Sequence, residues 1–204
     1  MRIKTSSYAR LRQYFHVSGK LTPPRMKTSL EEILILEDNE SFDEAFEAYK
    51  TLYNNDESDY AIWKHFYFFL WTSIEDAPSS FHERINLRDL LQVMFQRGKR
   101  AFANIADFNF IAGYTVSIFP YEYGDYKDLE KEGRDMLLRA TKLEPGNAIY
   151  RLAYLGGTSD VDPREYTQAA IEAAPKVLEN FAGRGALNKY CREIFYRLDK
   201  TAYR

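Results

Sequence analysis

The chain has 204 residues, of which 45% are hydrophobic and 16% aromatic, with a formal net charge of −2 at pH 7. This length fits a single domain, residues 1–204, and the composition is too rich in core-forming side chains for a disordered protein. The near-neutral total gives no bulk attraction to nucleic acid or to an anionic membrane, so we expect neither as a direct ligand. Its one cysteine, Cys191, excludes an internal disulfide and is typical of a reducing cytosol, so we expect a cytoplasmic protein.

Two segments bear on membrane association. The N-terminal residues include several basic side chains but no apolar stretch behind them, so they do not predict a secretory signal. The longest apolar run, 108–119, has 12 residues and includes Asn109, Thr115 and Ser117. It is too short and too polar to span a bilayer, and we expect a soluble protein.

Apolar residues recur at three- and four-residue spacing through nearly the whole chain, which predicts an all-α fold. Ser41 with Glu44 has the pattern of a capping box at a helix start. Asp59 can cap the next helix, and because 62–74 is apolar almost all round, we expect that helix to be central and buried. Asn86 starts a third helix in the same way.

One segment of the first half stays ambiguous. The apolar run 33–36 is the only possible strand in the chain. Thr28 with Glu31 can equally cap a helix that contains it.

The second half of the chain continues in helices. Pro120 ends one of them, and Gly156-Gly157 closes another. Pro175 either breaks the helix in which it lies or begins a new one. The expected helices start at or near Asp107, Tyr126, Asn147, Asp162 and the residue after Gly185.

The segment 143–147, Leu-Glu-Pro-Gly-Asn, closes one helix and opens the next. Ala140, Leu143 and Pro145 have the spacing of the closing pattern of a tetratricopeptide repeat. Gly133, seven residues before Ala140, is small enough to let two helices approach closely. We therefore predict an irregular stack of antiparallel helical hairpins with one degenerate tetratricopeptide-like unit in the middle.

Acidic residues are concentrated in 31–60, which has eleven carboxylates against one lysine, a local net charge of −10. In contrast, 1–27 has seven Lys or Arg residues and no acid. The acidic segment is either a solvated helix face that pairs with the basic termini or a surface for a basic partner, because such fields steer association. The acidic residues predicted to contact a partner are Glu37, Asp38, Glu40, Asp43, Glu44, Glu47, Asp56, Glu57 and Asp59.

Tyr121 and Tyr123 lie in a loop marked by proline and glycine. They either plug the junction between two helix pairs or serve as interface anchors, because tyrosine offers a large contact area with few rotatable bonds. Both are therefore also candidates for partner binding.

No residue pattern predicts catalysis. His16, His65 and His82 are far apart, and none has a metal ligand at helical spacing, so we expect no metal site. His65 is expected to be a core histidine and Cys191 a small buried side chain. We expect no catalytic residue and no cofactor, and hence no enzyme.

The middle of the chain resembles the helical immunity proteins of bacterial contact-dependent growth inhibition and related polymorphic toxin systems. The resemblance covers about 50 of the 204 residues. The residues that carry it are 110–114, 119–124, 130–133, 136–137, Ala140, 143–147 and Tyr150. It implies a cytosolic protein that binds and neutralises a cognate toxin domain, often a nuclease, and it supplies no catalytic residues and no fixed interface positions.

Both lines of reasoning agree on one hypothesis, that the acidic segment binds a basic toxin domain, since many nucleases are basic. The alternative is a tetratricopeptide-like scaffold or chaperone that binds a peptide or protein. An enzyme would have to gather dispersed side chains, for instance His82 with Glu83, and a nucleic-acid binder would use the basic termini. The sequence leaves the oligomeric state open.

Overall fold

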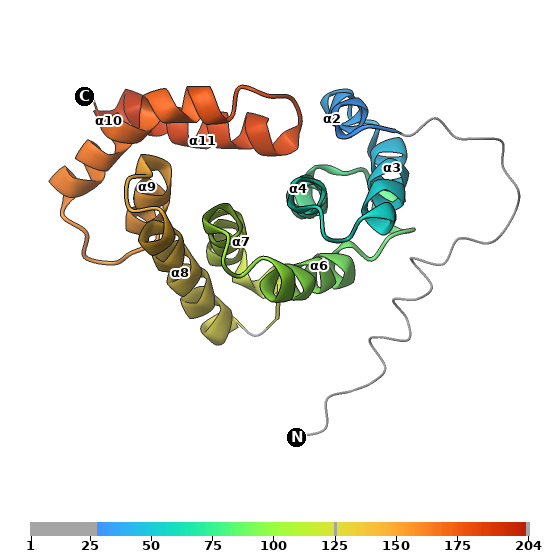
Figure 1. The fold of residues 1–204 in the computed structure, drawn as a ribbon, viewed down its shortest axis with the longest axis horizontal. Helices are drawn as coiled ribbons and strands as arrows, with labels where there is room; N and C mark the ends of the chain where they lie inside the picture. The colour runs from blue at the N-terminus through green and yellow to red at the C-terminus, as the bar shows by residue number, and fades with distance from the viewer. Residues whose placement is uncertain (1–27, 125, 203–204) are drawn as a thin grey trace, which may run out of the picture.

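The computed structural model describes residues 28–124 and 126–202 (Figure 1). Within them the chain forms ten α-helices and one 3-10 turn, with no strand, so the predicted all-α fold is confirmed. The basic segment 1–27 lies outside the described residues. The elements are α2 (Leu30–Asp38), α3 (Phe42–Asn55), α4 (Tyr60–Asp76), α5 (Ser79–His82), α6 (Leu87–Ala101), α7 (Ala106–Ile118), η1 (Pro120–Glu122), α8 (Tyr126–Leu143), α9 (Ala148–Gly156), α10 (Pro163–Asn180) and α11 (Ala186–Ala202).

The helices follow one another around a curved path that closes on itself (Figure 1). Neighbours in the chain pack together, with α2 on α3, α4 on α6, α7 on α8 and α9 on α10. The last helix, α11, returns to the beginning of the path and packs on both α4 and α2. Residues from the two ends of the described chain therefore pack against each other.

The centre of the molecule is α4, as the sequence predicts. Trp63 is fully buried, stacks on Tyr67 with ring centroids 4.7 Å apart, and donates from Nε1 to the carbonyl of Met94 on α6 at 3.0 Å. Farther along α4, Phe68 and Trp71 lie against Tyr190 of α11. These aromatic contacts join α4 to α6 on one side and to α11 on the other.

Two predicted helix starts differ from the structure. The segment 33–36 lies inside α2, and its capping box is formed by Ser29 and Glu32, one residue later than predicted. The Glu32 carboxylate accepts from the Ser29 amide at 2.7 Å. Ser41 makes no side-chain cap to α3, because Glu40 has a φ of 55° and the turn is closed by a backbone bond from the Ser41 amide to Leu36.

The other boundaries follow the sequence closely. Asp59, Asn86, Asn147 and Asp162 all cap helices with their side chains, as predicted. One helix starts at Ala106, which places Asp107 in its first turn. The break predicted at Pro175 is wrong, because α10 continues to Asn180. The helix is maintained by neighbours of Pro175 that are buried: Ala169, Ala170, Ala173, Ala174 and Val177.

Candidate protein-binding surface

The predicted acidic residues lie on α2, on α3 and in the turns that flank α3 (Figure 1). The structure separates them into carboxylates that hold the fold together and carboxylates that line open surface. This separation decides which of them can contact a partner.

Glu37 and Asp38 hold the fold together. The Glu37 carboxylate accepts from the Tyr49 hydroxyl at 2.5 Å and from the Ala186 amide at 2.6 Å. Asp38 accepts from the Gly185 amide at 3.0 Å. Both carboxylates therefore cap the positive N-terminus of α11 from a distant part of the chain.

The environment of Glu37 also changes its acidity. Burial raises the pKa of the Glu37 carboxyl to about 7, although the hydrogen bonds from Tyr49 and Ala186 favour the charged form. Glu37 is therefore a titrating structural group near neutral pH, and its two partners lie within the chain.

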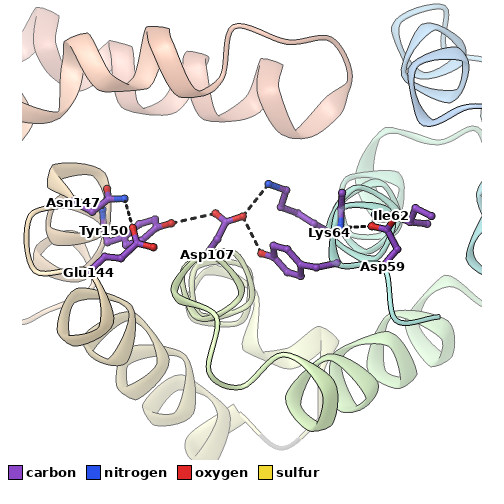
Figure 2. Close-up of polar contacts among 9 residues, drawn as sticks. Asp59, Ile62, Lys64, Asp107, Glu144, Asn147 and Tyr150 are labelled. Atoms are coloured by element: carbon purple, nitrogen blue, oxygen red, sulfur yellow. Dashed lines mark hydrogen bonds and ion pairs between the residues drawn. The ribbon is translucent and has the colours of Figure 1, made fainter. Parts of the chain in front are cut away.

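Asp59 and Glu57 also have structural partners. Asp59 caps α4 by accepting from the Ala61 and Ile62 amides at 2.8 and 3.1 Å, the second of which is drawn in Figure 2. Glu57 forms an ion pair with Arg97 of α6 at 3.0 Å. The Asp59 cap fixes the start of α4, whereas the Glu57 pair is an exposed surface pair that contributes only about 0–1 kcal/mol.

The acids of α3, together with Asp56 directly after it, border an open groove of about 1130 Å³, which we call the acidic groove. Its rim carries Asp43, Glu44, Glu47 and Asp56, and these are all the charged side chains among the described residues that line it. Leu36, Ala48, Leu52 and Ile62 supply the apolar part of its wall, and the remaining lining residues are Thr28, Ser29, Thr51 and Asn55.

The rim carboxylates are exposed and ready to exchange partners. Nη2 of Arg84 donates to both carboxylate oxygens of Asp43, at 2.6 and 2.7 Å. Glu47 forms an ion pair with Lys50 at 2.7 Å. Exposed pairs of this kind contribute only about 0–1 kcal/mol each, so a partner's cation can replace them at little cost. Hydrogen bonds from the Ser58 hydroxyl and amide lower the pKa of Asp56, which favours its charged form.

Glu40 lies in a second cleft, of about 520 Å³, between α2, α4 and α11. Asp76 and Glu193 face the same cleft, together with Lys189. Sequence reasoning missed Asp76 and Glu193, because they come from helices far from Glu40 in the chain and no motif marks them. Only the packing of α11 on α2 and α4 brings them together.

The two candidate tyrosines have different environments. Tyr121 is 54% exposed on η1, and its ring is tilted against that of Phe119 with the centroids 5.7 Å apart. Tyr123 is buried, and its hydroxyl lies 2.6 Å from that of Tyr67. Tyr123 therefore joins η1 to α4 and offers no surface to a partner, whereas Tyr121 is open but is not among the residues that line the acidic groove.

Sequence reasoning also missed a polar cluster around Asp107 (Figure 2). Its carboxylate accepts from the Tyr60 hydroxyl and the Lys64 ammonium of α4, both at 2.9 Å, and from the Tyr150 hydroxyl of α9 at 3.4 Å. Burial and the negative charge of Asp107 raise the pKa of Tyr60 and Tyr150. Both hydroxyls therefore stay protonated as donors, and the cluster fastens α4, α7 and α9 together.

His65 and Cys191 are two described residues with potentially reactive side chains whose pKa values are shifted by burial. Burial lowers the pKa of His65 to about 4 and raises the pKa of the Cys191 thiol, so both are neutral at pH 7. His16 lies outside the described residues, and Nε2 of His82 lies 3.1 Å from the carbonyl of Ala77. Across 28–124 and 126–202, no group of three or more His, Cys, Asp or Glu residues is arranged to hold a metal ion.

Two further findings bear on function. None of the described helices combines the length and the apolar character needed to cross a bilayer. In comparisons with known proteins, no family model, no curated protein and no solved structure matches the chain.

Proposed function

We propose that this protein is an immunity protein that binds a cognate bacterial toxin domain and neutralises it by protein–protein contact. The toxin domain is basic, as a nuclease domain typically is. The observation that carries the proposal is the acidic groove, in which four exposed carboxylates border an apolar wall. Glu37, Asp38, Asp59 and Tyr123 are not part of the proposed interface, because their polar groups hold the fold together.

The two parts of the groove have different roles in binding. Burying apolar surface against the wall favours binding because it removes that surface from water. The rim carboxylates attract a basic domain and raise the rate of association, more strongly at low salt. Leu52, partly buried, and Glu44, exposed, represent the two parts.

The route of α11 favours this proposal over a tetratricopeptide-like scaffold. A scaffold of that kind would bind a peptide along the inner face of its helices. Here α11 covers the inner helices, with Tyr190 against Trp71 of α4 and Phe195 against Phe110 of α7. That face is packed core, whereas the acidic groove on α3 is open.

The tetratricopeptide-like character of the middle segment remains a prediction with one supporting contact. A Cβ on Gly133 would lie 2.8 Å from the Ser117 amide nitrogen and 3.0 Å from the Gly113 carbonyl oxygen. Helices α7 and α8 therefore approach as closely as the small residue at position 133 suggests.

A growth assay tests the proposed function. The C-terminal segment of the adjacent upstream reading frame is induced in a bacterial host with and without this protein. We expect arrest of growth that co-production of the protein relieves. Arrest that persists in the presence of the protein would contradict the proposal.

A further inference from the structure

The acidic groove lies where the N-terminal segment of the chain joins the described structure. Thr28 and Ser29, the first two described residues, line the groove themselves. Residues 1–27 are therefore tethered directly to the groove. A short tether of this kind gives an effective local concentration in the millimolar range.

The segment and the groove are complementary in charge. Residues 1–27 include seven Lys or Arg residues and no Asp or Glu. The groove presents four carboxylates, and every charged side chain among its described lining residues is acidic. The segment also has apolar and aromatic residues to cover the apolar wall, namely Tyr8, Leu11, Tyr14, Phe15, Val17 and Leu21.

The lengths of the two elements also agree. Helix α3 has 14 residues and is about 21 Å long. The eight Cα-to-Cα steps from Lys20 to Thr28 can span up to about 28 Å. This span exceeds the length of α3, so Lys20 can reach along the helix from Thr28, whereas Arg25 and Lys27 stay nearer to Thr28.

We propose that residues 1–27 of this chain bind the acidic groove within the same molecule and act as an internal competitor of its basic partner. The binding itself depends only on the groove and the segment. Its regulatory consequence rests on the proposed function. A partner must displace the segment before it can bind. The partner's apparent affinity therefore falls in proportion to the fraction of molecules whose groove is free.

A paramagnetic label in the full-length protein tests the binding. Ser18→Cys provides an attachment site for a nitroxide, while Cys191 is only 2% exposed and its raised thiol pKa keeps it unlabelled. We expect broadening of the amide signals of groove residues on α3. That broadening should be lost at high salt and in the Glu44→Lys/Glu47→Lys variant of the labelled chain.

A matched control separates the groove from general charge. Glu172→Lys/Glu179→Lys makes the same charge change on the exposed face of α10, and Glu179 pairs with Lys176 as Glu47 pairs with Lys50. The control variant should keep the broadening. Broadening that survives in the Glu44→Lys/Glu47→Lys variant would reflect the tether alone and would overturn the proposal.

Two more measurements check the role of the segment and exclude binding between two copies of the chain. Lys20→Gln/Arg25→Gln/Lys27→Gln alters the segment without touching the groove, and it should abolish the broadening as fully as the groove variant. In a mixture of spin-labelled chains and isotope-labelled chains without a nitroxide, we expect no broadening. Broadening in the mixture would assign the groove to a second copy and would overturn the proposal.

All of these measurements are made without a toxin, so their result does not depend on the growth assay. If the toxin is neutralised but no broadening is seen, only the internal competitor is contradicted. If the broadening is seen but the toxin is not neutralised, only the proposed function is contradicted.

Discussion

The amide of Ala186 donates to the carboxylate of Glu37 at 2.6 Å, across 149 positions of the sequence. This bond joins the first described helix to the last and closes the curved path of helices (Figure 1). The adjacent Gly185 has a φ of +86°, and a Cβ there would lie 2.6 Å from the Glu37 carboxylate oxygen. Only glycine fits this junction without strain.

The stability of the protein should depend on pH through Glu37. The folded-state pKa is raised from 4.5 to about 7, so the folded state holds a proton that the unfolded chain releases between these values. The contribution is therefore fully present below pH 4.5 and is lost as pH rises through 7, by roughly 3 kcal/mol of unfolding free energy.

Urea unfolding of the wild type and of Glu37→Gln across this range measures the effect. The amide side chain of Gln can still accept from Ala186 but does not titrate. The wild type should lose stability relative to Glu37→Gln between pH 4.5 and 7, and the difference should be constant above pH 8. Parallel stability curves for the two proteins would contradict this assignment.

Asp107 should be among the polar residues on which the fold depends most. Replacing it with Ala leaves the Lys64 ammonium, 24% exposed, without its counter-ion, and two hydroxyls without their acceptor. We expect a loss of about 2–3 kcal/mol in unfolding free energy. The control is Glu132→Ala, which removes one ion pair of similar exposure and should cost no more than about 1 kcal/mol. Equal losses in the two variants would contradict the role of the Asp107 cluster.

The contact between α7 and α8 should not tolerate a methyl group at Gly133. In an isolated helix, Gly→Ala is stabilising by about 1 kcal/mol. Here the added Cβ would lie 2.8 Å from the backbone of Ser117, so we expect Gly133→Ala to lower the melting temperature, by the equivalent of about 1–3 kcal/mol. Gly146→Ala, whose Cβ would meet nothing within 4 Å, should leave it nearly unchanged. A stabilised Gly133→Ala would mean that the helices are not in close contact.

Local sequence patterns predicted the helices because helix caps and apolar spacing depend only on residues close together in the chain. The cap at Asp59 and the apolar circumference of α4 need only neighbouring residues to be recognised. Pro175 misled the prediction because α10 is held by buried side chains on either side of it, which is a property of packing. Ser41 misled it because the turn before α3 is fixed by the backbone conformation of Glu40.

The site could be predicted only as a segment. A run of carboxylates shows that 31–60 is acidic, but it does not show which of them meet a partner within the chain. Glu37 and Asp38 accept hydrogen bonds from the amides at the start of α11, which begins more than 140 positions later in the chain. The sequence predicted Asp107 only as a helix start. Its partners Lys64 and Tyr150 are distant in the chain, and only folding brings them next to it.

The most direct measurement of the central claim is toxin neutralisation by charge-reversed variants of this protein. Rescue of growth and the rate of association with the toxin are compared for the wild type, Glu44→Lys/Glu47→Lys and the Glu172→Lys/Glu179→Lys control. We predict that the groove variant associates at least about tenfold more slowly at low salt and rescues poorly, and that the control behaves like the wild type. Equal association rates and equal rescue for all three proteins would contradict the acidic groove as the docking surface.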